Sequence, residues 1–190
     1  MKFPTLKITR PADLAGIENG KLPAGLLADG PGAKLHYMAA TAFNAAQLAA
    51  FFDGHSLEIM PGGGIRTYDQ QVALFNDRYQ LTPTGRIPIV TRTYQGKTWY
   101  LKKGKAPAGT PGNSPHGWGL FGDVKGTSTN PNPLTRWMID NLPAFGIYWE
   151  VADPSNPNFE SWHVGLCTGN YTPRVLESIA AFPALERKPS

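Results

Sequence analysis

Hydrophobic and polar residues alternate with a helical period along two stretches of the chain. Between residues 39 and 52, alanine, leucine and phenylalanine side chains recur every three or four positions, and the run ends at Asp53-Gly54. Between residues 67 and 79 a second apolar face recurs at the same interval, and it begins with Thr67 and Gln70 in the arrangement of a capping box. We predict an amphipathic helix over each stretch.

Shorter runs of apolar and β-branched residues predict strands. They are expected at residues 57–60, 120–124, 147–151 and from residue 163, with a hairpin formed by residues 87–94 and 98–101 around Gln95-Gly96. Asn132 and Pro133 are typical of a helix N-terminus and predict a third helix over residues 134–142. A last helix is expected over residues 172–182.

These elements predict a single α+β domain with a small antiparallel sheet flanked by helices. With 190 residues the chain is long enough for one sizeable core and short for two. Residues 1–34 are rich in Gly, Pro and Leu and have no clean period, so we expect an N-terminal arm packed on the domain. The domain itself is expected over residues 35–190.

The chain carries a formal net charge of +4, and its basic residues are scattered apart from Lys102, Lys103 and Lys105. A nucleic-acid site would show a basic stripe with interleaved aromatic residues, whereas this cluster is more typical of a solvated loop. We therefore expect no nucleic-acid partner, and we expect a monomer. A mild positive charge is compatible with an anionic polymer such as a bacterial cell wall.

No apolar run approaches the length of a membrane span, and residues 1–7 lack the apolar stretch of a secretory signal. We expect a protein made in the cytoplasm without a signal peptide and without a membrane partner. If such a protein acts on the cell wall, another factor, such as a phage holin, must release it.

Two segments about forty residues apart hold the side chains that say most about chemistry. Ser114-Pro-His116 is followed by three glycines and Asp123, and Glu160-Ser-Trp-His163 precedes an apolar run. Two imidazoles, a carboxylate and an open fourth position are typical of a catalytic zinc site, and a second carboxylate beside the metal can accept a proton from water. We expect Asp123 and His163 on neighbouring antiparallel strands, His116 at the mouth of a loop and Glu160 in the turn before His163.

The order Ser-x-His-x-x-Gly-x-x-x-Asp followed by Glu-x-Trp-His resembles the zinc DD-peptidase family. This family includes VanY-type D-alanyl-D-alanine carboxypeptidases and phage L-alanyl-D-glutamate endolysin peptidases. Its first motif has Ala where this chain has Phe121, a difference that affects packing and not a ligand. The resemblance implies a hedgehog/DD-peptidase-like fold, one Zn²⁺ ion held by His116, Asp123 and His163, and Glu160 as the catalytic base.

A third segment, Gly64-Ile-Arg66-Thr67 with Gln71, is similar to the Gly-Tyr-Arg-Ser-x-x-x-Gln segment of the same family, with Ile65 and Thr67 as mild departures. A guanidinium offers a rigid fork that suits a carboxylate. The resemblance implies that Arg66 is a catalytic and substrate-binding residue that pairs with a carboxylate or carbonyl of the peptide, and that Gln71 also binds substrate. Alone, the segment favours an Arg66 that precedes a helix and pairs with a surface acid, whereas the presence of both metal motifs favours the substrate-binding role.

The resemblance implies hydrolysis of a stem peptide of bacterial peptidoglycan by a phage or bacterial cell-wall lytic enzyme. It leaves open whether the enzyme is a D-Ala-D-Ala carboxypeptidase or an L-Ala-D-Glu endopeptidase. Ser114 and Trp118 are further candidates for substrate contacts, and Tyr148 and Trp149 are candidates for the wall of the cleft. A serine before Pro115 is also typical of a turn, and aromatic residues more often fill a core.

Two other classes of function compete with this interpretation. A non-catalytic peptidoglycan-binding or phage structural module could keep the same fold, but a pure binder has no need of Glu160. A cysteine or serine enzyme lacks a recognisable third member of a triad. Cys167, the single cysteine, lies four residues after His163, and we expect it to be a small buried residue.

Overall fold

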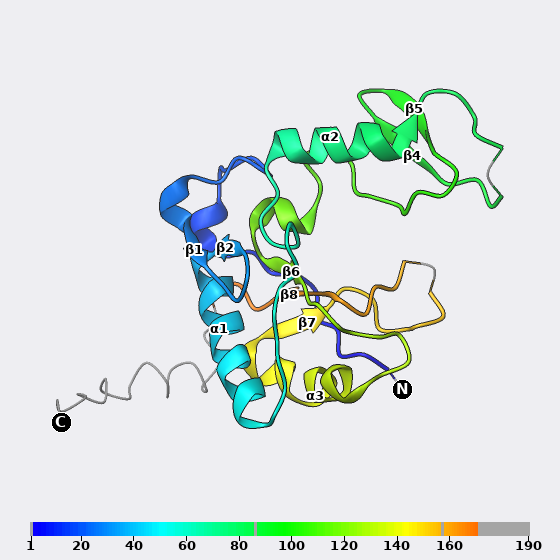
Figure 1. Cartoon of the computed structure of the whole chain (residues 1–190). Helices are drawn as coiled ribbons and strands as arrows, with labels where there is room; N and C mark the ends of the chain where they lie inside the picture. Colours follow the sequence, from blue (N-terminus) through cyan, green and yellow to red (C-terminus); the bar gives the residue numbers. More distant parts are fainter. Residues whose placement is uncertain (1, 86, 157, 171–190) are drawn as a thin grey trace, which may run out of the picture.

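The computed structural model describes residues 2–85, 87–156 and 158–170, and Figure 1 shows the arrangement of their helices and strands. The α-helices are α1 (Tyr37–Phe52), α2 (Tyr68–Arg78) and α3 (Pro133–Asn141). The strands are β1 (Leu27–Asp29), β2 (Lys34–His36), β3 (Tyr79–Gln80), β4 (Thr91–Tyr94), β5 (Lys97–Leu101), β6 (Phe121–Asp123), β7 (Ile147–Trp149) and β8 (His163–Leu166). Four short 3₁₀ helices complete this set: η1 (Ala12–Leu14), η2 (Ala24–Leu26), η3 (Pro115–Trp118) and η4 (Leu142–Phe145).

The strands form small antiparallel sheets in the orders β1-β2, β3-β5-β4 and β6-β8-β7. The α+β prediction is therefore confirmed, although three sheets replace the single sheet that was expected. The β6-β8-β7 sheet lies at the centre of the molecule in Figure 1, and its middle strand is the last one along the described chain. Its two outer strands each come from a different part of the sequence.

Helix α1 contributes its alanines and Phe43 to the main core, whereas Leu48 and Phe51, which also belong to the predicted apolar face, are exposed. Its buried residues Ala39, Phe43 and Ala46 belong to the same cluster as Val164 and Leu166 of β8. Gly122 of β6 lets Phe43 and Ile59 pack closely against the sheet, because a Cβ atom at position 122 would meet their side chains.

Helix α2 carries the β3-β5-β4 sheet at its far end, away from the central sheet (Figure 1). Its predicted capping box is present, since Thr67 accepts a hydrogen bond from the backbone of Gln70 and the Gln70 side chain accepts one from the backbone of Thr67. A separate small cluster of Phe75, Tyr79 and Leu101 packs this end of the chain. The predicted hairpin is confirmed over β4 and β5.

The N-terminal residues pack against the central sheet. Phe3 is buried and its ring contacts Trp149 edge-on at 5.1 Å between centroids. The Trp149 backbone donates a hydrogen bond to the carbonyl of Pro4, and Leu14 is part of the main core. The boundary between an arm and a domain at residues 34 and 35 stays a prediction.

Several predicted strands are shorter than expected, and one predicted helix cannot be compared. Residues 57–60 form a single bridge, between Ile59 and Val124, with one hydrogen bond on each side of it, from the Met60 amide to Asp123 and from the Lys125 amide to Glu58. The hairpin strand begins at Thr91, not at residue 87. The helix expected over residues 172–182 lies outside the described residues. No helix in the described part of the chain is both long enough and apolar enough to cross a membrane.

Candidate metal centre

The register of the central sheet brings two of the predicted ligands together. Asp123, the last residue of β6, pairs directly with His163, the first residue of β8. Directly opposed residues of an antiparallel pair share one face of the sheet. His163 Nδ1 accordingly lies 3.0 Å from Asp123 Oδ1. The prediction that these residues lie on neighbouring antiparallel strands is confirmed.

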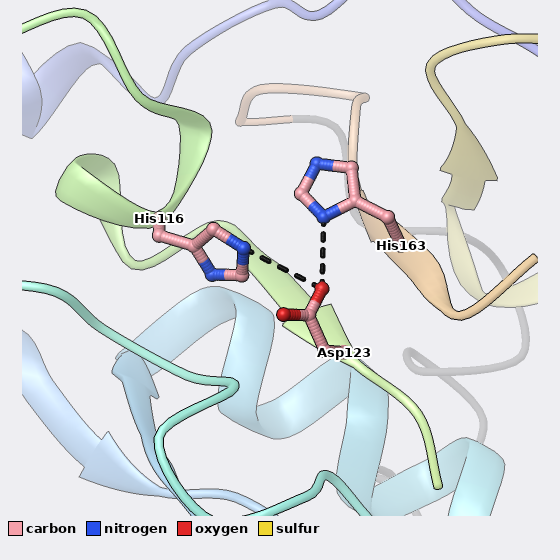
Figure 2. Close-up of side chains that lie close together, drawn as sticks. All are labelled: His116, Asp123 and His163. Atoms are coloured by element: carbon pink, nitrogen blue, oxygen red, sulfur yellow. Dashed lines mark hydrogen bonds and ion pairs between the residues drawn. The ribbon is translucent and has the colours of Figure 1, made fainter. Parts of the chain in front are cut away.

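The third predicted ligand comes from the short helix η3 before β6. His116 Nε2 lies 3.5 Å from Asp123 Oδ1, and Figure 2 shows both imidazoles directed at this carboxylate. The chain turns back after η3 at Gly119, which has a φ of 64° and lies so close to the backbone of His36 that a Cβ atom could not fit. This turn leads the chain from His116 directly into β6.

The geometry and the donor types of this cluster fit a zinc ion. His116, Asp123 and His163 each offer one ligand atom, and these atoms lie within 4.8 Å of one another. Donor atoms about 2.1 Å from a tetrahedral ion are about 3.4 Å apart, close to the 3.0 and 3.5 Å distances between the histidine nitrogens and Asp123 Oδ1. Two imidazoles with one carboxylate form a donor set that zinc accepts, and a catalytic zinc ion keeps its fourth position for water or substrate.

Hydrogen bonds and neighbouring charges keep Asp123 ionised, which is the form that can bind a metal. Burial disfavours its charged form, but hydrogen bonds and charge from His116 and His163 outweigh burial and hold the pKa of Asp123 well below its usual range. Burial alone would lower the pKa of His163, yet its hydrogen bonds to Asp123 and Glu150 raise the pKa to about 9. The carboxylate is therefore ionised at neutral pH.

Glu160 lies beside this cluster, at the start of the turn that leads into β8. Its backbone carbonyl accepts a hydrogen bond from the His163 amide, as expected for the turn predicted there. Its half-buried side chain interacts electrostatically with all three residues of the cluster. Burial, with a smaller effect of Asp123, raises the pKa of Glu160, while the two histidines oppose this. A carboxylate in this position can exchange protons with a molecule at the cluster.

Comparison with known protein families decides what kind of protein carries this cluster. Residues 32–168 match the model of the VanY family, described as D-alanyl-D-alanine carboxypeptidase. The chain belongs to the VanY family. The matched stretch holds every residue of the cluster together with Arg66 and Glu160, and the resemblance read from the three motifs is confirmed. No curated protein matches the chain.

The arginine of the VanY segment is held next to the cluster. The Arg66 amide donates to the His116 carbonyl, and its guanidinium interacts with the charges of Asp123 and Glu160. Burial lowers the pKa of Arg66. Arg66 Nη1 donates to Gln71 Oε1 at 3.0 Å, and Gln71 Nε2 donates to the Gly109 carbonyl at 2.7 Å. Gln71 is only 2 % exposed, so in this structure it supports Arg66; its predicted contact with substrate stays a prediction.

Two further predicted substrate residues line one cavity. Ser114 and Trp118 border a cavity of about 380 Å³, which Arg10 and Glu150 also border. The Arg10 guanidinium lies over the Trp118 ring at 4.6 Å from its centroid. Ser114 is nearly buried and its backbone is held by Asn19, which accepts from the Ser114 amide and donates to the Ser114 carbonyl.

Of the two residues suggested for the cleft wall, Trp149 fills the core instead. It is 1 % exposed, and its indole nitrogen donates to the Ser161 carbonyl. Inward-facing positions of a three-stranded sheet alternate with outward-facing ones, so Trp149 points away from the neighbouring Tyr148. Tyr148 is half-buried and packs against the same core.

Sequence reasoning missed Glu150 and Asn19. Glu150 Oε2 accepts a hydrogen bond from His163 Nε2 at 3.1 Å. This contact follows from the register of β7 and β8. Glu150 is one residue beyond the Trp149–Val164 pair, so it lies opposite His163. Asn19 belongs to the stretch interpreted as an arm and had no such signal.

Proposed function

We propose that this chain is a zinc-dependent peptidase that hydrolyses stem peptides of bacterial peptidoglycan. The observation that carries the proposal is the convergence of His116, Asp123 and His163, whose ligand atoms lie within 4.8 Å of one another in a protein of the VanY family. These three residues would hold one Zn²⁺ ion. When bound, the ion would polarise the scissile carbonyl and lower the pKa of a water molecule toward neutrality.

Glu160 is the proposed proton carrier. Its half-buried carboxylate lies beside these three residues, and no side chain in the described part of the chain is hydrogen-bonded to it, so it is available to a water molecule. It takes a proton from the attacking water and passes it to the nitrogen of the leaving amine. The same group thus acts first as a base and then as an acid.

Arg66 is proposed to hold the acidic part of the substrate. Its guanidinium donates a hydrogen bond to Gln71 and interacts with the charges of Asp123 and Glu160. In a carboxypeptidase it would pair with the C-terminal carboxylate of the stem peptide, which fits the description of the VanY family. In an L-Ala-D-Glu endopeptidase of the endolysin type it would pair with the D-Glu carboxylate. The cavity beside Ser114 and Trp118 would take a neighbouring part of the peptide.

The test is digestion of purified muropeptides and synthetic stem peptides by the zinc-loaded protein, with the products identified by mass spectrometry. We expect release of a terminal alanine for carboxypeptidase action, or cleavage between L-Ala and D-Glu for endopeptidase action. Glu160→Gln keeps the size of the side chain and removes the base, so it should lower kcat by about 10²–10⁴-fold.

The matched control is Glu58→Gln, which changes an exposed glutamate that is not part of the cluster. This variant should retain wild-type turnover. Intact peptide after incubation with the zinc-loaded wild-type protein would contradict the proposal and would favour a module that only binds peptidoglycan. Wild-type turnover by Glu160→Gln would contradict the role of Glu160 alone.

A further inference from the structure

His163 lies between two carboxylates that come from the two neighbouring strands. Asp123 pairs with it directly across β6, and Glu150 lies opposite it beyond the end of β7. The three side chains therefore form a row across the central sheet. The distances along this row are 3.0 Å from Asp123 Oδ1 to His163 Nδ1 and 3.1 Å from His163 Nε2 to Glu150 Oε2.

The two nitrogens of the His163 ring consequently have different roles. Nδ1 faces the cluster and is the nitrogen that can ligate a metal. Nε2 faces Glu150, which as a carboxylate can only accept a hydrogen bond, so Nε2 carries the proton. When a metal takes the place of the proton on Nδ1, this contact holds the ring in the one neutral tautomer in which Nδ1 can ligate.

His116 shows the same arrangement with the nitrogens exchanged. Its Nδ1 lies 2.9 Å from the carbonyl oxygen of Gly64, to which it donates, and its Nε2 faces Asp123. The partner of His116 is a neutral carbonyl, whereas the partner of His163 is a carboxylate. A hydrogen bond to a charged acceptor is the stronger of the two and raises the basicity of the ligating nitrogen more.

We propose that Glu150 is a positioning residue of the metal centre, which fixes the tautomer and orientation of His163 and strengthens its bond to the cation. This inference rests on the proposed zinc site. Glu150 is not itself a ligand, because it contacts the nitrogen that points away from the cluster. Its side chain is 37 % exposed and borders the 380 Å³ cavity, so it can be replaced without opening the core.

Zinc affinity of the purified full chain, measured by competition with a chromophoric chelator, tests the inference. Glu150→Ala removes the acceptor and should weaken zinc binding by about 10–100-fold. Glu150→Gln keeps an acceptor oxygen but removes the charge, and it should weaken binding by less than Glu150→Ala. The control Glu58→Gln should bind zinc as the wild type does. A melting curve of each zinc-free variant establishes that all are equally folded.

Nitrogen-15 NMR of the histidine rings is a second measurement, and its result would not change if Glu150 had only a structural role. In the zinc-loaded wild type, His163 should show a protonated Nε2, and Glu150→Ala should shift this signal while the His116 signals stay unchanged. Wild-type zinc affinity in Glu150→Ala, or an unchanged His163 signal, would overturn the inference. Failure of the wild-type protein to bind zinc would instead overturn the proposed function, so the two failures are distinguishable.

Discussion

The single cysteine illustrates how burial decides the chemistry of one residue. Cys167 follows β8 and is fully buried, as predicted. Burial, with a smaller effect from the charge of Glu150, raises the pKa of its thiol to about 12. A thiol that stays protonated at neutral pH is a poor nucleophile. This residue therefore gives no support to a cysteine enzyme.

Alkylation of Cys167 should be slow in the folded protein. At pH 8 the thiolate fraction is roughly 10³-fold lower for a pKa near 12 than for a free cysteine, and burial limits access further. Mass spectrometry after timed exposure to iodoacetamide, with and without urea, measures the two rates. Rapid alkylation without urea would show that the thiol is exposed or ionised.

At the scale of elements, the β6–β8 pairing depends on a glycine placed under an aromatic ring. Gly165 pairs with Phe121, and a Cβ atom at position 165 would overlap the Phe121 ring. The same ring stacks on His163 with 4.7 Å between centroids and an angle of 26° between the planes. The phenylalanine that replaces the alanine of the family motif therefore fits, because the facing residue is a glycine.

Gly165→Ala should lower the free energy of unfolding by about 1–3 kcal/mol, because the added methyl group overpacks the pair. It should also weaken zinc binding, since Phe121 supports the His163 ring. Gly25→Ala is the control, because a Cβ atom there meets nothing within 4 Å. Urea denaturation and the chelator competition measure both effects, and wild-type stability of Gly165→Ala would refute the packing argument.

The elements that sequence predicted well are those specified by local signals. The capping box of α2, the Asn132 cap of α3 and the Gln95-Gly96 turn each depend on residues within a few positions of one another. The division into separate sheets, and the reduction of residues 57–60 to one bridge, depend on distant partners such as Val124. Sequence periodicity does not contain that information.

At the scale of the whole molecule, the site is assembled from segments that span most of the chain. The residues of the cluster were found from their spacing and their family resemblance, because both are properties of the sequence. Glu150 was missed, since its role depends on the register between β7 and β8. Asn19 was missed because its contact with Ser114 joins residues 95 positions apart.

The N-terminal residues also contribute to the site, although residues 2–31 precede the stretch that matches the VanY family. Thr5 forms a bridge to Trp149, next to Glu150, and Arg10 borders the cavity with Trp118. A hydrogen bond from the Gly20 amide to the Gly117 carbonyl holds η3 beside the same segment. Residues 2–31 therefore support both sides of the candidate metal centre.

The most direct test of the account is a crystal structure of the zinc-loaded protein with anomalous data collected at the zinc edge. We expect one strong anomalous peak, about 2.0–2.2 Å from His116 Nε2, Asp123 Oδ1 and His163 Nδ1. A zinc ion bound elsewhere, or ligated without both imidazoles, would contradict the central claim that these three side chains form the metal centre.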